Sequence, residues 1–135
     1  MTIEEGLFAF LTADVDLTAL VGSRIYPMVL PEEPAGDELP PDFVTYQRTG
    51  GTREGAAKGA TPCNTASYDV GGWSATYLGA KRLALTLRDA FDRAQDRLGT
   101  VLVARVDAEH TRDDYNPVLR VFGAIVSLTV QYLEG

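Results

Sequence analysis

The sequence contains little of the chemistry that covalent cross-links or metal centres need. Its 135 residues include one cysteine, Cys63, and one histidine, His110. One cysteine cannot form an internal disulfide, and one cysteine with one histidine cannot build a Cys/His zinc site. We therefore expect a domain that folds without such cross-links, which suits a reducing compartment.

Long apolar runs are also missing. The longest stretch without a charged residue, Val121 to Leu133, has 13 residues, whereas a membrane-spanning helix needs about 20. The start of the chain carries Glu4 and Glu5 where a secretory signal would be basic. We expect a soluble protein that is not exported and has no membrane partner.

Basic residues are scarce in the first third of the chain. Residues 1–47 contain nine acidic residues and one base, Arg24, whereas the remainder is nearly neutral. Tight binding to nucleic acid needs clustered Lys and Arg that release counterions. We therefore expect no specific binding to DNA, although this charge distribution is compatible with a surface past which DNA slides.

What is present predicts one globular domain over residues 1–135, since 45% of the residues are hydrophobic and 23% are charged. Thr2 and Glu5 have capping-box spacing and predict a helix from Ile3 to about Ala13. Asp16 is the expected N-cap of a short helical turn through Val21, which Gly22 ends. The clearest helix follows Thr76 and keeps its apolar periodicity to Leu98, with Gly99 as its C-cap.

The remaining elements are expected to be strands. Phe122, Ala124, Val126, Leu128, Val130 and Tyr132 share one face of the last strand, whose length predicts a central position in the sheet. The glycine pair Gly71-Gly72 suggests a bulge. The expected strands are Arg24–Leu30, Phe43–Arg48, Thr65–Ser74, Thr100–Asp107 and Val118–Tyr132.

These elements predict an α+β fold. We expect a mainly antiparallel sheet of four to five strands, with the N-terminal helix and the long helix packed on one face and the other face in water. Three exposed loops are expected, at about residues 31–42, 49–64 and 108–117. A loop as long and as poor in large apolar residues as 49–64 is typical of a functional or disordered segment.

One constellation could carry chemistry. The stretch Asp107 to Asp114 contains four acidic residues and His110, and carboxylates with a histidine can hold Mg²⁺ or Mn²⁺. The alternative interpretation is a solvated turn between strands, and no partner motif elsewhere completes a site. Trp73 and the tyrosines at 46, 68 and 77 are expected to serve core or inter-subunit packing rather than base stacking. We therefore expect no catalytic residue, cofactor or metal.

The order of short motifs resembles a family of phage proteins. The motifs are Leu20-Val21-Gly22, Arg24-Ile25-Tyr26-Pro27, Leu30-Pro31, Val44-Thr45-Tyr46-Gln47-Arg48, Tyr68-Asp69-Val70, Trp73-Ser74-Ala75-Thr76-Tyr77, Asp113-Asp114-Tyr115 and Arg120. Together they resemble the tail-completion proteins of long-tailed phages and prophages, also called tail terminators or tail-to-head joining proteins. The acidic segment Pro31 to Asp42 and the glycine pair depart from the family pattern.

The resemblance implies a structural virion protein at the tail-neck junction, assembled in the bacterial cytoplasm. It implies a ring, commonly a hexamer, that caps the tail tube, stops its polymerisation and meets the head connector, while DNA passes through without specific binding. The alternative is a small metal-dependent enzyme or a monomeric binding module that uses Asp107 to Asp114. The residues that we expect at partner interfaces are Arg48, Arg53, Lys58, Asp113, Asp114 and Tyr115.

Overall fold

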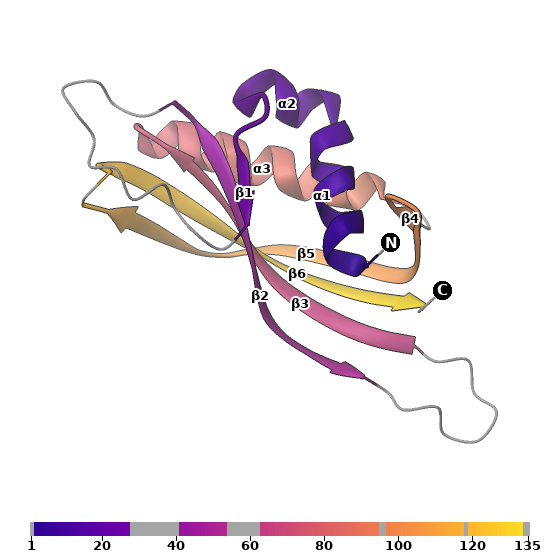
Figure 1. Ribbon diagram of the computed structural model, residues 1–135. Coiled ribbons are helices and arrows are strands. Elements are labelled where there is room, and N and C mark those ends of the chain that lie inside the picture. Colours follow the sequence, from indigo (N-terminus) through magenta and orange to yellow (C-terminus); the bar gives the residue numbers. More distant parts are fainter. Residues whose placement is uncertain (1, 28–40, 54–62, 95–96, 118, 134–135) are drawn as a thin grey trace.

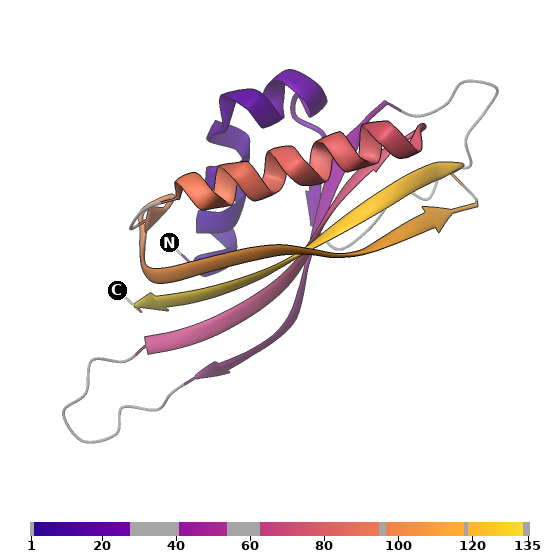
Figure 2. The same ribbon diagram turned by 180° about the vertical axis from the view of Figure 1, so that it is seen from behind.

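A twisted six-stranded sheet carries three helices on one face (Figures 1 and 2). The computed structural model describes residues 2–27, 41–53, 63–94, 97–117 and 119–133. The elements are α1 (Ile3–Ala13), α2 (Val15–Val21), β1 (Ile25–Pro27), β2 (Phe43–Arg53), β3 (Cys63–Ser74), α3 (Tyr77–Arg93), β4 (Arg97–Leu98), β5 (Val101–Asn116) and β6 (Val121–Leu133).

The sheet has the strand order β1-β2-β3-β6-β5-β4. All neighbours are antiparallel except β1 and β2, which are parallel. The α+β class, the helices on one face and the central position of β6 are confirmed. The expected strand number was too low, because β4 was assigned to the long helix, and the sheet is mixed because the short β1 joins its edge in parallel.

The two N-terminal helices begin at side-chain caps. Thr2 and Glu5 form the predicted capping box, with both reciprocal bonds at 3.2 Å. The expected N-cap at Asp16 was wrong. Asp14, whose extended backbone separates the two helices, caps α2 by accepting a 2.9 Å bond from the Leu17 backbone N–H, and this places Asp16 in the first turn. Gly22 ends α2 as predicted, with φ of 59°.

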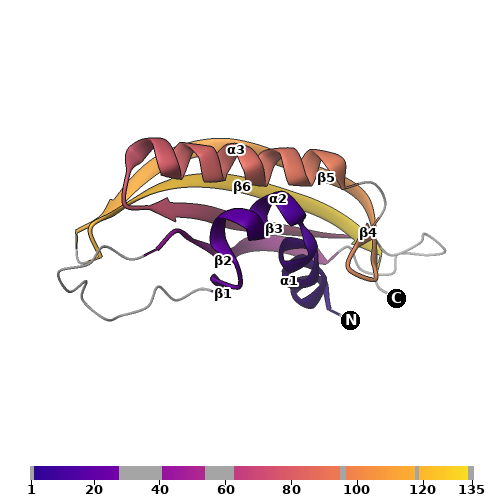
Figure 3. The same cartoon turned by 90° about the horizontal axis from the view of Figure 1, so that it is seen from above.

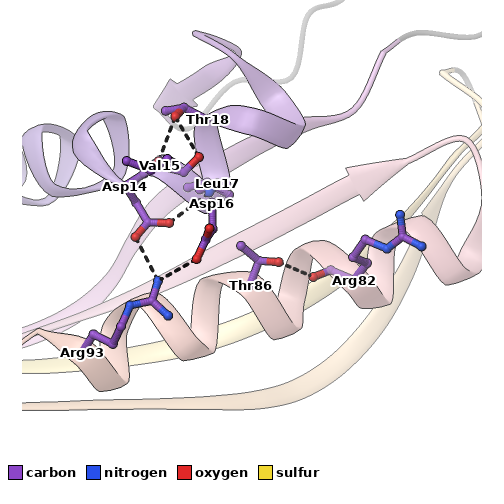
Figure 4. A network of polar contacts seen from close by, with 8 residues as sticks. All are labelled: Asp14, Val15, Asp16, Leu17, Thr18, Arg82, Thr86 and Arg93. Carbon is purple, nitrogen blue, oxygen red and sulfur yellow. Dashed lines mark hydrogen bonds and ion pairs between the residues drawn. The ribbon is translucent and has the colours of Figure 1, made fainter.

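An ion-pair cluster joins α2 to the end of α3. The Arg93 guanidinium lies 3.1 Å from Asp14 Oδ1 and 3.5 Å from Asp16 Oδ2, and Figure 4 shows both carboxylates turned toward it. α3 ends at Arg93 rather than at Leu98. Leu98 is fully buried beside α1, so the chain leaves the helix early and uses Gly99, with φ of 61°, to turn from β4 into β5.

The main core lies between the helices and the sheet. The even-numbered positions of β3 and β6 face α3, as the alternation predicted, and meet Leu83, Leu87 and Phe91. The bulge expected at Gly71-Gly72 was wrong, since both residues pair in regular register. A Cβ on Gly72 would lie 2.5 Å from Leu83 Cβ, so the glycine instead lets α3 approach the sheet closely.

A smaller core lies on the opposite face of the sheet, which corrects the expectation that this whole face is in water. Trp73 packs on Phe43 with ring centroids 6.2 Å apart, and its indole N–H donates to Thr45 Oγ1 at 2.9 Å. Leu119, Val121 and Ile125 complete this buried cluster. Trp73 and Tyr68 are buried packing residues as predicted, whereas Tyr77 is 47% exposed.

Several expected loops and strand ends differ from the structure. β2 continues to Arg53 and β3 begins at Cys63, because backbone pairing resumes beyond a bulge at Arg48 and Gly50. The loop expected at 108–117 is the second half of β5, which pairs with β6 up to Asn116. β6 begins at Val121 rather than Val118, and β1 is confined to Ile25–Pro27. Residues 31–40 of the first expected loop lie outside the described residues.

Candidate partner-binding surfaces

The residues expected at partner interfaces that the structure describes lie in two regions of the sheet. Arg53 ends β2 opposite Asn64, which pairs with Tyr132 near the end of β6. Asp113 pairs with Ala124, close to the start of β6. In Figures 1 and 2 these ends are the β2–β3 hairpin and the β5–β6 hairpin. The structure therefore divides the expected interface into two separate groups.

The first group carries positive charge beside α1. The Arg48 side chain is exposed, donates to the Gly50 carbonyl oxygen at 3.3 Å and lies 3.9 Å from Glu4 Oε1. Arg53 is the last residue of β2. Lys58 itself lies outside the described residues.

The second group is a polar cluster between α3 and β5. Asp113 Oδ1 accepts from Lys81 Nζ at 2.6 Å and lies 2.9 Å from His110 Nε2, while Oδ2 accepts from the Tyr77 hydroxyl at 3.1 Å. The hydrogen bond from Lys81 is the main cause that lowers the pKa of Asp113, and the same bond raises the pKa of Lys81. The cluster fastens the first turns of α3 to β5.

Asp114 and Tyr115 follow on the same strand. Asp114 is exposed, and its carboxylate accepts from the backbone N–H of Tyr115 at 2.7 Å. Tyr115 is 47% exposed, and its ring centroid lies 4.9 Å from that of Phe122, which in turn meets Tyr77 edge-on. An exposed aromatic surface thus adjoins the Lys81–Asp113 pair.

The pleat of β5 places the side chains of the acidic stretch, which suggested a metal site, on two different faces of the sheet. His110 and Asp113 pair with Val126 and Ala124, whose side chains face the helices. Asp107 and Glu109 pair with Thr129 and Ser127 and therefore face the other side of the sheet. Across the described ranges, no group of three or more His, Cys, Asp or Glu side chains is placed to hold a metal ion.

That other face has its own polar contacts. Arg112 Nη2 lies 2.9 Å from Asp69 Oδ2, and Arg105 Nε lies 2.8 Å from Asp107 Oδ2. The Thr111 and Ser127 hydroxyls are 3.1 Å apart. The Arg112–Asp69 and Thr111–Ser127 contacts link β5 to β3 and β6, whereas the Arg105–Asp107 pair lies within β5.

An open groove between α1 and β2 was not predicted. It has a volume of about 470 Å³ and is lined by Thr2, Glu4, Glu5, Phe8, Ala9 and Tyr46. Phe8 is 41% exposed, with its ring centroid 6.3 Å from that of Tyr46. Burial, with a smaller contribution from Glu4, raises the pKa of Tyr46. The one sequence signal was Phe8, a large apolar residue outside the buried stripe of its helix.

The other functional side chains that sequence reasoning missed are Lys81 and Tyr77 in their role beside Asp113. They are 32 and 36 positions away from it in the chain. A lysine on a helix face has no sequence signal that identifies the strand opposite it. In the part of the chain that the structure describes, no helix has the length and apolar character that a membrane crossing requires.

The arrangement defines an α+β domain, in which one twisted sheet is covered by a layer of helices. One polar cluster of this domain lies between α3 and β5. A family model described as "Tail completion protein gp17" matches residues 5–132, and the chain belongs to this family. The resemblance inferred from the ordered motifs is thereby confirmed.

The fold is similar to that of a chain in the solved structure "Virion of native gene transfer agent (GTA) particle". The TM-score is 0.70 and the sequence identity 17%, and the match covers 98% of this chain and 95% of that chain. A comparison with curated protein sequences finds no match. The protein is accordingly a structural protein of a phage-type tail.

Proposed function

We propose that the protein forms a ring, commonly a hexamer in the family that its motifs resemble, and that this ring caps the tail tube, stops its polymerisation and joins the tail to the head connector. Membership of the tail completion family over residues 5–132 is the observation that carries the proposal. The virion source of the structurally similar chain supports a place in the virion, at the tail-neck junction. Assembly would take place in the bacterial cytoplasm, and the role requires no catalytic residue, cofactor or metal.

The separation of the two interface groups supports this role. A ring that lies between a tube and a connector must present a different surface to each. Arg53 ends β2 at the end of the sheet opposite to Asp113, while Arg48 lies in the middle of β2, where it pairs with Tyr68. The two groups differ in composition, with arginines in one and an aspartate cluster beside an exposed tyrosine in the other, and this difference allows each to select a different partner.

The acidic excess of residues 1–47 supports passage of DNA without adhesion. Like charge opposes contact with phosphates, so DNA would slide through the assembled ring rather than bind to it. We expect no measurable affinity for duplex DNA at physiological salt. A fluorescence anisotropy titration that showed micromolar binding with a steep salt dependence would contradict this.

Electron microscopy of particles from a deletion strain tests the proposal. Without the gene, we expect tubes of uncontrolled length and heads without tails, and the wild-type gene on a plasmid should restore joined particles of uniform tail length. Labelling of an epitope-tagged chain should mark the neck. Joined particles of normal tail length in the deletion strain would refute the proposed function.

A further inference from the structure

The outer face of α3 exposes apolar side chains that nothing in the described part of the chain covers. Leu78 is 77% exposed and Leu85 is 55% exposed. These residues are seven positions apart and therefore lie on one side of the helix. Arg82 lies between them, and Figure 4 shows its side chain extending from α3 without reaching any residue drawn there. This leucine–arginine surface has the composition of a contact rather than of a solvated helix face.

The groove between α1 and β2 has the complementary composition. Its aromatic residues, Phe8 and Tyr46, can receive an aliphatic side chain, and Glu4 and Glu5 line it with negative charge. Glu5 is committed to the capping box, whereas the one ion pair of Glu4 among the described residues is the 3.9 Å approach to Arg48. Glu4 is therefore the carboxylate that a second cation can engage.

The charges of the two surfaces are opposite. The first twelve residues of α3, Tyr77 to Arg88, include three bases and no acid. Lys81 is held by Asp113, while Arg82 has no ion pair among the described residues. The first turn of α1 carries Glu4 and Glu5 and no base. An arginine between two leucines thus matches a carboxylate beside two aromatic rings.

The two surfaces occupy different sides of the same molecule. Seen from above, α1 lies on one side of the helical layer and α3 on the other (Figure 3). Two distinct patches that fit each other on one chain produce head-to-tail contacts, and such contacts close into a ring when the rotation between copies allows it. Because both halves are present in this one sequence, the natural occupant of the groove is a second copy.

We propose that the groove between α1 and β2 receives the outer face of α3 from the neighbouring copy, with Leu78 and Leu85 against Phe8 and Tyr46 and with Arg82 against Glu4. This inference rests on the proposed ring and identifies its subunit contact. The contact involves few residues on each side, fewer than a typical stable interface. It would therefore be weak in the free protein and would be reinforced when several copies assemble on a tube end.

A charge exchange tests the contact. The variants are Glu4→Arg, Arg82→Glu and the double variant. Arg105→Glu is the control for Arg82→Glu, because it makes the same change in charge on the opposite face of the sheet. Self-association is measured by sedimentation over a concentration series, with the protein alone and with the purified tail-tube protein. Thermal unfolding establishes that each variant is folded.

We expect each single variant to weaken self-association about tenfold and the double variant to recover most of it, because the exchanged charges again meet between copies. Leu85→Gln should weaken association without any change in charge, and the Arg105 control should behave as wild type. Folded single variants that associate as wild type, or a double variant that shows no recovery, would overturn the contact.

The outcomes separate the contact from the proposed function. If the variants lose only their binding to the tube protein while self-association is unchanged, the occupant of the groove is the tube protein and the inference is wrong. If wild-type protein forms rings and capped tails that none of the substitutions affects, the proposed function stands and the inference fails. Wild-type protein that forms no ring even on tube ends would overturn both.

Discussion

Lys81 Nζ lies 2.6 Å from Asp113 Oδ1, and this contact fixes the first turns of α3 to the charged half of β5. The contact joins a face of α3 and the acidic stretch of β5, which are far apart in the sequence, into one polar cluster. The cluster adjoins Tyr115, which is 47% exposed.

The first prediction concerns the acid side of the pH profile. The pKa of Asp113 is lowered in the folded protein, mainly by Lys81. Its contribution to stability is therefore present above the unfolded pKa and is lost as the pH falls through the folded pKa. Asp113→Asn should unfold at a lower temperature than wild type near neutral pH, and the difference should vanish in acid. Because both side chains are partly exposed, the difference should also shrink at high salt.

The second prediction concerns the alkaline side. Tyr68 is 1% exposed, its hydroxyl has no hydrogen-bond partner among the described residues, and burial raises its pKa to about 12 from 10.0. The fold therefore disfavours ionised Tyr68, so this ionisation does not affect stability well below pH 10, and stability is lost as the pH rises from 10 toward 12. Tyr68→Phe should increase stability by about 1 kcal/mol at neutral pH and flatten the loss above pH 10. Denaturant titrations across this range would show it, and a variant less stable than wild type at pH 7 would contradict it.

The third prediction tests the close approach of α3 to the sheet. Gly72→Ala should cost about 1–3 kcal/mol, because the added methyl group would meet Leu83 Cβ and the adjacent helix backbone. Gly50→Ala is the matched control, since nothing lies within 4 Å of a Cβ at that position. Urea unfolding compares the two variants. Equal stabilities would mean that α3 lies farther from β3 than described.

The fourth prediction separates the two aspartates near α2. Asp14→Ala should destabilise the protein by about 1 kcal/mol, because it removes the N-cap and one partner of Arg93. Asp16→Ala should cost less than about 0.5 kcal/mol, since its side chain is 72% exposed and caps no helix. Chemical denaturation measures both, and a larger loss at Asp16 would reverse the assignment.

The fifth prediction concerns the segment between β2 and β3. Residues 54–62 contain no large apolar side chain, so replacement by a short Gly-Ser turn should leave thermal stability nearly unchanged. We expect capped tails to be lost, because the replacement removes Lys58, which is close in sequence to Arg48 and Arg53, and with it part of the positive charge offered to an acidic neighbour. Complementation of the deletion strain provides the assay. Joined tails at normal yield would exclude this segment as an interface.

Elements whose ends are set by local chemistry were predictable. Two helix ends are set by neighbouring backbone groups, at the capping box of Thr2 and Glu5 and at the glycine after Val21. β6 was predictable because one of its faces is buried along most of its length, which produces a long alternation of apolar residues. The ends set by packing were not predictable. Leu98 leaves the helical periodicity because a buried position beside α1 is available, and Asp113 and Asp114 belong to a strand because β6 offers them a backbone partner despite their low strand propensity.

The candidate interface was predictable to a similar degree. Ordered motifs identified Asp113 to Tyr115 together with the family, but the contact of Asp113 with Lys81 depends on how α3 crosses the sheet. Phe8 was the only local indication of the groove at α1, and its partner Tyr46 lies on a strand 38 positions away in the chain.

The outer edge of β5 has a further consequence for the life of the free subunit. Only Val101 and Leu102 pair with β4. In the described structure, the rest of this sixteen-residue strand therefore has no strand partner on its outer side and forms an edge of the sheet. A long unpaired edge strand can pair with strands of other molecules and start fibres. Charged residues along β5, such as Arg105, Asp107, Glu109 and Arg112, disfavour such pairing. The same residues would keep newly made copies of the free subunit from associating through this edge.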